Sequence, residues 1–177
     1  MYHESDCTNV AAVYGDDRPY PAEALILPFT PELTHYRADA LLVRCIDNRF
    51  WKMLRAFTRY LELGHIDLVS VVGGGQFISS PERSEDRHVL LRKIDKSIRL
   101  HHTQRVILTT HHDCGAYGGF AYFGNDLKAE YDYHCREHEE MRAVVRAHFP
   151  GLAVDTYFFG NEGVVLTMPS IPYRLVY

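Results

Sequence analysis

The sequence has no long hydrophobic run and few cysteines, and each absence removes a class of protein. Its longest apolar stretches, such as residues 40–43 and 163–166, are far shorter than the roughly 20 residues that a membrane-spanning helix needs. The first residues are polar and acidic and contain no apolar signal-peptide core. Four cysteines, at positions 7, 45, 114 and 135, are few for a secreted disulfide scaffold. We therefore expect a cytoplasmic protein without a membrane partner, whose thiols are available for metal binding or catalysis.

Basic residues are not in excess either. The 19 Lys and Arg residues are scattered among 23 Asp and Glu residues, which gives a formal net charge of −4. Proteins that bind nucleic acid or an anionic membrane carry a basic patch or stripe, so neither is expected as the main partner. With 177 residues, 46% of them hydrophobic and 24% charged, the chain has the composition of one soluble globular domain.

The spacing of apolar and turn-forming residues predicts a single α/β domain that follows an irregular arm. Residues 1–37 are rich in Tyr, Pro and Asp and predict the arm, so we assign residues 38–177 to the domain. Within the domain, strands are predicted at 38–46, 66–72, 105–110, 152–159 and 164–168, helices at 50–63, around 90–98 and at about 126–148, and a charged loop at 80–86. Alternating strands and helices predict a mainly parallel central sheet of four to five strands, flanked by helices.

Two groups of metal-binding residue types follow strands of this sheet. Cys45 ends the first predicted strand, and residues 111–114 (HHDC) follow the third. In parallel sheets, ligands bind outside the carboxyl ends of the strands, so both groups can share one crevice. A catalytic zinc ion takes three protein ligands such as Cys and His and keeps a fourth position open. Cys45, one histidine and Cys114 supply such a set.

Two histidines compete for the third ligand position. His112 and Cys114 would lie on one face if the strand continued, whereas His111 and Cys114 do so only if the chain turns. Gly115 favours a turn. We therefore predict His111 as the ligand and keep His112 as the alternative.

A carboxylate and a guanidinium stand directly after the first cysteine, at Asp47 and Arg49. Arginine can bind a carboxylate through two hydrogen bonds, which orients the carboxylate and keeps it ionised. Asp47 could then accept the proton of a zinc-bound water, or bind the metal itself when no water is present. An ion pair that only ties a loop is the simpler interpretation of the same two residues.

Together these residues form the pattern Cys-x-Asp-x-Arg followed by His-x-x-Cys-Gly, which is similar to the signature of β-class carbonic anhydrases. The resemblance covers about residues 38–160. It implies Zn²⁺ held by Cys45, His111 and Cys114, a catalytic dyad of Asp47 and Arg49, and reversible hydration of carbon dioxide to bicarbonate through zinc-bound hydroxide. It also implies a homodimer or a higher homo-oligomer.

One segment departs from that family. After the second strand, family members commonly carry an Arg-Asn segment, whereas residues 72–77 of this chain read VGGGQF. Glycines allow backbone N–H groups to approach an anion closely, so we predict that Gly74, Gly75 and Gly115 contact the substrate. The departure leaves open another small substrate, such as carbonyl sulfide or carbon disulfide, or a zinc-binding sensor without turnover.

Two further interpretations stay open. In a thiol enzyme, Cys114 would be the nucleophile and His111 or His112 the base.

His134 and His138 stand four residues apart on a predicted helix, a spacing that can chelate a metal. Because the glutamate of the zincin motif is missing there, we expect a solvated polar face instead. Cys7 is expected to be an exposed thiol of the arm.

Overall fold

The computed structural model describes residues 24–27, 29, 31 and 33–168 of the chain. Cys7 and most of the predicted arm lie outside the described residues. Contacts divide the chain into two units, Met1–His35 and Tyr36–Tyr177, and the second unit carries every helix and strand named below. The predicted boundary between residues 37 and 38 stays a prediction.

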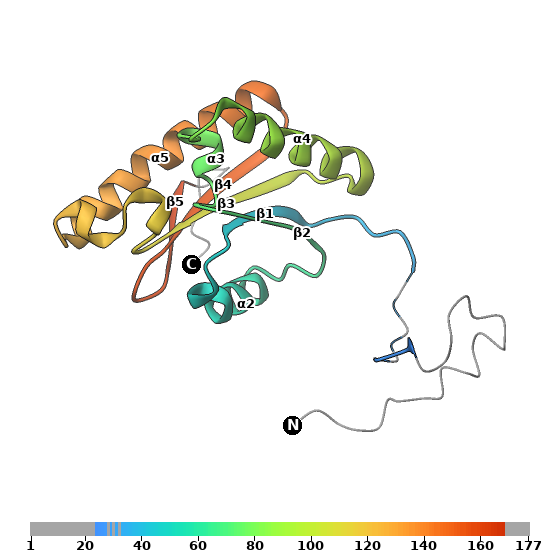
Figure 1. Ribbon diagram of the computed structural model, residues 1–177. Coiled ribbons are helices and arrows are strands. Elements are labelled where there is room, and N and C mark those ends of the chain that lie inside the picture. Colours follow the sequence, from blue (N-terminus) through green and yellow to red (C-terminus); the bar gives the residue numbers. More distant parts are fainter. Residues whose placement is uncertain (1–23, 28, 30, 32, 169–177) are drawn as a thin grey trace, which may run out of the picture. The chain divides into compact units, whose positions relative to one another are not determined.

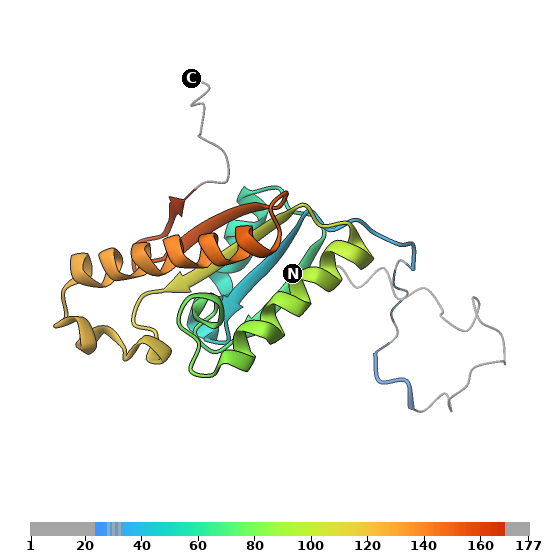
Figure 2. The ribbon, with the colours of Figure 1, turned by 90° about the horizontal axis from the view of Figure 1, so that it is seen from above.

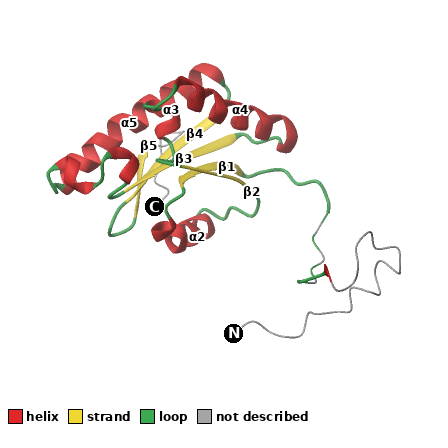
Figure 3. Cartoon of the chain, in the orientation of Figure 1, coloured by secondary structure: helices red, strands yellow, loops and turns green. Residues whose placement is uncertain are grey.

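The central feature is a five-stranded sheet (Figures 1 and 3). Its strands are β1 (Ala40–Cys45), β2 (Ile66–Val71), β3 (Arg105–His111), β4 (Ala153–Phe159) and β5 (Val164–Met168), in the spatial order β2-β1-β3-β4-β5. Neighbouring strands are parallel from β2 to β4, and β5 is antiparallel to β4. The four residues between β4 and β5 are too few for a parallel crossover. The predicted α/β fold with a mainly parallel sheet is confirmed.

Helices cover both faces of the sheet. Figures 1 and 2 show α2 on one face and α3, α4 and α5 on the other. The elements are η3 (Asn48–Phe50), α2 (Trp51–Tyr60), α3 (Gln76–Ser79), α4 (Ser84–His101), η4 (Gly115–Tyr117), η5 (Phe120–Phe123) and α5 (Leu127–His148), where η marks a 3₁₀ helix. Among the described residues, no helix has both the length and the apolar character that a bilayer crossing requires.

The predicted start of α4 and the predicted end of α2 were each wrong by three residues. The loop predicted at 80–86 ends early because α4 already begins at Ser84, where Glu85 and Asp86 favour a helix N-terminus by their charge. The helix predicted to reach residue 63 ends at Tyr60, and Glu62 takes the left-handed conformation with φ 55°. The left-handed residue that follows the helix is therefore a glutamate, although glycine adopts this conformation most readily.

The strand β1 shows how the sheet is buried on both sides. Leu41 and Val43 pack into the cluster under α3, α4 and α5, while Ala40 and Leu42 pack into the cluster under α2. A strand that is buried on both faces has a nearly continuous apolar sequence. For this reason apolar and polar residues do not alternate along β1. Since β1 and β3 are parallel neighbours, their last residues, Cys45 and His111, lie at the same edge of the sheet.

Candidate metal centre

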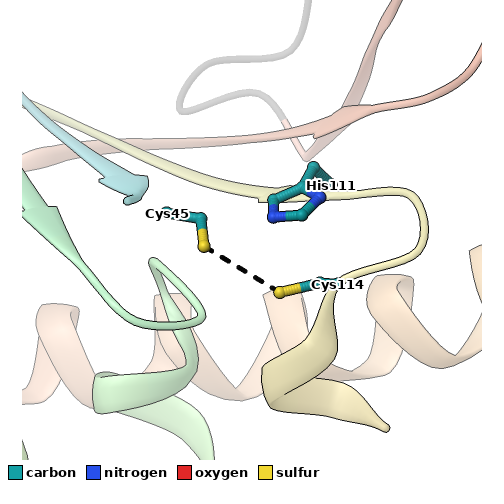
Figure 4. Close-up of side chains that lie close together, drawn as sticks. All are labelled: Cys45, His111 and Cys114. Atoms are coloured by element: carbon teal, nitrogen blue, oxygen red, sulfur yellow. Dashed lines mark hydrogen bonds between the residues drawn. The ribbon is translucent and has the colours of Figure 1, made fainter. Parts of the chain in front are cut away.

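Three side chains converge at the carboxyl ends of β1 and β3, as Figure 4 shows. One ligand atom each of Cys45, His111 and Cys114 lies within 4.8 Å of the others, and all three residues are buried. The two Sγ atoms are 4.0 Å apart. Two thiolates on a tetrahedral zinc ion, each with a Zn–S bond of about 2.3 Å, would stand about 3.8 Å apart. The spacing therefore fits a shared metal ion.

The ring of His111 is oriented as a metal ligand would be. Its Nδ1 lies 2.8 Å from the backbone carbonyl oxygen of His112. A carbonyl oxygen only accepts, so Nδ1 carries the proton and donates, which leaves a lone pair on Nε2 of the neutral ring. This Nε2 atom is buried and has no hydrogen-bond partner among the described residues. A buried acceptor without a partner is costly, and a metal ion would satisfy it.

A tight turn brings Cys114 back to His111. Strand pairing ends at His112, whose N–H donates to the carbonyl oxygen of Phe159 at 2.9 Å. Asp113 then adopts a left-handed conformation with φ 53°, which aspartate tolerates better than most residues. The turn required by the choice of His111 is thus present, although Asp113 forms the bend and not Gly115. His112 lies outside the cluster, with its Nδ1 2.5 Å from Glu130.

The two thiols affect each other strongly. A hydrogen bond from Cys114 lowers the pKa of Cys45 and favours its thiolate. The same interaction raises the pKa of Cys114, because a second negative charge beside Cys45 in a buried site is unfavourable. A divalent cation between the sulfurs would remove this repulsion and hold both groups deprotonated. The donor set therefore suits a soft cation such as Zn²⁺.

Arg49 holds Asp47 beside this cluster. Its Nε lies 2.9 Å and its Nη2 2.7 Å from Oδ2 of Asp47, and its backbone N–H donates to Oδ1 at 2.8 Å. Hydrogen bonds from Arg49 lower the pKa of Asp47 to about 2, so this carboxylate is ionised at neutral pH. Oδ2 of Asp47 is 3.9 Å from Nε2 of His111. The predicted ion pair therefore forms, and it stands next to the three candidate ligands.

A family profile described as "Putative carbonic anhydrase" matches residues 37–168. The chain belongs to this carbonic anhydrase family. A protein of Rickettsia conorii without a described function is 26% identical over 140 residues, which cover 76% of this chain and 74% of the relative. A second such protein, from Rickettsia bellii, is 24% identical over 131 residues, covering 72% of this chain and 80% of the relative.

Solved carbonic anhydrases share the fold of this family member. The β-carbonic anhydrase isoform I of Trichomonas vaginalis superposes with a TM-score of 0.55 at 14% identity, over 81% of this chain and 90% of that protein. The carbonic anhydrase of Streptococcus mutans gives a TM-score of 0.50 at 16% identity, over 82% and 92% of the two chains. At this identity the likeness establishes the fold alone. The predicted resemblance to the β class is confirmed.

Two charged residues near the carbonic anhydrase motifs, Arg44 and Asp113, were not predicted from the sequence as part of the site. Arg44 is buried, and its Nε and Nη2 each lie 2.5 Å from a backbone carbonyl oxygen, of Cys45 and of Asp47 respectively. Asp113 accepts from Arg49 twice, through Oδ2 from Nη1 and through its carbonyl oxygen from Nη2, both at 2.9 Å. An arginine inside an otherwise apolar strand was the signal that could have pointed to Arg44.

The histidine-bearing face of α5 was predicted to be solvated, and that prediction was wrong. His134 and His138 are fully buried. His138 bonds Thr110 through Nε2 at 2.9 Å, and burial lowers the pKa of both histidines to about 3. The spacing could have shown this, because these histidines share a helical stripe with apolar residues that face the sheet. The buried members of the stripe are Glu130, His134, His138, Met141 and Val145.

The glycine-rich segment that distinguishes this chain packs closely against the site. The N–H groups of Gly74 and Gly75 donate to the carbonyl oxygens of Val71 and Thr109, at 3.1 and 3.2 Å. These hydrogen bonds already use the two N–H groups, so the structure explains Gly74 and Gly75 by packing. Their contact with substrate stays a prediction, as does that of Gly115, where an added Cβ would meet only open space.

We expect Gly74→Ala to lower the free energy of unfolding by about 3 kcal/mol. Gly74 has φ 59°, and an added Cβ would lie 2.5 Å from the carbonyl oxygen of Thr109 and 2.9 Å from the backbone nitrogen of Cys45. Urea denaturation measures the change. Gly151→Ala is the control, since a Cβ there meets nothing within 4 Å. Equal stability of the two variants would contradict the close packing described above.

Proposed function

We propose that this protein catalyses the zinc-dependent, reversible hydration of carbon dioxide to bicarbonate. The observation that carries the proposal is the joint placement of the three candidate ligands and the Asp47 carboxylate, whose Oδ2 lies 3.9 Å from Nε2 of His111. In this proposal Cys45, His111 and Cys114 hold Zn²⁺. The unpartnered Nε2 of His111 and the sulfur spacing of 4.0 Å support this ligand set.

Asp47 and Arg49 have different roles in the proposed reaction. A zinc ion at this position would acidify a bound water and so supply a nucleophile at neutral pH. Asp47 is ionised, so its Oδ2 can accept a hydrogen bond and orient that nucleophile, while the proton lost from the water would pass to solvent. Arg49 keeps Asp47 in place through Nε and Nη2 and stays protonated throughout, because the neighbouring carboxylates raise its pKa.

The lining of the site supports a small neutral substrate. A small pocket at the cluster is lined by the apolar side chains of Phe50, Leu54 and Phe159 together with polar residues that include Arg44 and Asp47. Carbon dioxide is small and uncharged, so apolar side chains next to the candidate metal ligands suit it as a substrate. Carbonyl sulfide and carbon disulfide have the same linear shape, so substrate choice has to be measured.

Stopped-flow measurement of carbon dioxide hydration tests the proposal on the zinc-loaded protein. We expect hydration well above the buffer rate, at a pH high enough to ionise a zinc-bound water. A protein that holds stoichiometric zinc but does not hydrate carbon dioxide would contradict the proposed activity and leave a zinc-binding module, or an enzyme for another heterocumulene. A protein that purifies without zinc would instead favour the thiol enzyme.

The homodimer and the cytoplasmic location are further parts of this proposal. The homodimer is supported by the resemblance to the β class. The location is supported by the scarcity of cysteines, because disulfide-rich chains are typical of secreted proteins. The proposed roles of Asp47, Arg49 and the three candidate ligands depend neither on the homodimer nor on the location.

A further inference from the structure

A buried carboxylate lies behind the candidate metal centre. Glu130 is 1% exposed and stands in the first turn of α5, where the helix dipole favours a negative charge. Its Oε2 lies 2.5 Å from Nδ1 of His112, and its Oε1 accepts the backbone N–H of Asp113 at 2.7 Å. Burying a carboxylate is costly unless hydrogen bonds satisfy it. Here both donors come from the turn between His111 and Cys114.

The first of these hydrogen bonds acts on the candidate histidine ligand. Glu130 holds the ring of His112, and the carbonyl oxygen of the same residue accepts Nδ1–H of His111 at 2.8 Å. The carbonyl oxygen of His112 therefore keeps the proton of His111 on Nδ1 and fixes the direction in which Nε2 of His111 points. Groups that orient a ligand in this manner affect metal affinity although they do not touch the metal.

The second hydrogen bond acts on the candidate catalytic pair. Glu130 anchors the backbone N–H of Asp113, the residue that adopts the left-handed conformation with φ 53°. Asp113 in turn receives Nη1 and Nη2 of Arg49, both at 2.9 Å. Arg49 then holds Asp47 through Nε and Nη2. A continuous chain of hydrogen bonds therefore leads from the buried helix to the carboxylate beside the metal site.

We propose that Glu130 is a positioning residue for the metal centre: it fixes the turn at His112 and Asp113, and through that turn it orients both His111 and the pair of Arg49 and Asp47. This inference rests on the proposed function, because it assumes that a metal binds at this site. One side chain, that of Glu130, makes hydrogen bonds to both His112 and Asp113. The proposal assigns Glu130 to the centre although it comes from a helix outside both sequence motifs.

The test measures metal affinity, with hydration as a separate readout. Glu130→Ala should weaken zinc binding by about 10-fold to 100-fold, measured by competition with a chelator. In the cobalt-substituted protein, the same variant should change the visible absorption, which depends on coordination geometry. Asp155→Ala is the matched control, because Asp155 is also a buried carboxylate and pairs with Arg105 at 2.7 Å, near the other end of β3. It should lower stability but leave the zinc affinity and the cobalt spectrum of the folded protein unchanged.

Glu130→Gln keeps the proposal testable if the alanine variant does not fold. Its amide oxygen can accept the N–H of Asp113, while its NH₂ group donates to Nδ1 of the other His112 tautomer. We therefore expect zinc affinity within about threefold of the wild type, since the geometry assigns the role to hydrogen bonds. Wild-type zinc affinity in Glu130→Ala would overturn the positioning role, and so would a folded Glu130→Gln that binds zinc as weakly as an alanine variant.

These outcomes separate the two proposals. If the wild-type protein binds zinc but does not hydrate carbon dioxide, the proposed function fails while the effect of Glu130 on affinity can still be measured. If hydration is present and the affinity does not depend on Glu130, only the positioning role fails. A wild-type protein without zinc affinity would overturn both.

Discussion

Cys45→Ser and Cys114→Ser are each expected to weaken zinc binding by roughly a hundredfold to a thousandfold and to abolish hydration of carbon dioxide. Structural zinc sites with four ligands bind with about 10–16 kcal/mol, so one ligand accounts for roughly 2.5–4 kcal/mol. A serine hydroxyl remains protonated at neutral pH and is a poor substitute for a thiolate. Chelator competition and metal analysis after dialysis measure the loss.

Cys135→Ser is the matched control for these variants. Cys135 is only partly buried and does not belong to the cluster, so its replacement should leave zinc binding and hydration unchanged. Zinc retained at full affinity in both Cys45→Ser and Cys114→Ser would contradict the proposed ligand set.

The histidine ligand is tested in the same assay. His111→Ala should lose zinc as the cysteine variants do, because it removes Nε2, a buried candidate ligand atom that has no hydrogen-bond partner among the described residues. His112→Ala leaves the three candidate ligands in place, so it should retain zinc with an affinity reduced far less than in His111→Ala, by the loss of the contact with Glu130. Zinc retained by His111→Ala and lost by His112→Ala would reverse the assignment.

Asp47→Asn is expected to keep stoichiometric zinc and to lose hydration activity by about a hundredfold or more, because the acceptor that orients the nucleophile is lost. The carboxamide is uncharged, and its NH₂ group would face either the nucleophile or the guanidinium of Arg49, which has only donors. The ligand atoms of Cys45, His111 and Cys114 are not altered. Stopped-flow hydration and zinc analysis of the same preparation separate the two effects.

Asp95→Asn is the control for this variant. Asp95 forms an exposed ion pair with Arg99 at 3.0 Å on α4, and it resembles the pair of Asp47 and Arg49 in chemistry but not in place. Its replacement should change neither zinc content nor hydration. Hydration at the wild-type rate in Asp47→Asn would mean that the ion pair only ties the loop after β1.

The fold and the three candidate ligands could be predicted from the sequence, because both depend on short apolar runs and on the residues that end them. The buried strands appear as short apolar runs, and Cys45 and His111 stand at the ends of two of them. Parallel strands place such ends at one edge of the sheet, so the meeting of two motifs 66 residues apart followed from the order of the elements. The ion pair of Asp47 and Arg49 was also predictable, since the residues are two apart.

Only the tertiary structure decided what surrounds this core. Periodicity groups Glu130, His134 and His138 on one face of α5 with apolar residues, but it does not say which groups of the sheet and its loops that face meets. The contact between Glu130 and the turn at His112 and Asp113 joins residues 17 and 18 positions apart across two elements. Sequence by itself therefore determined the candidate ligands and the edge of the sheet where they meet. The packing of α5 decided which groups hold them, because hydrogen bonds between elements depend on how those elements are placed in space.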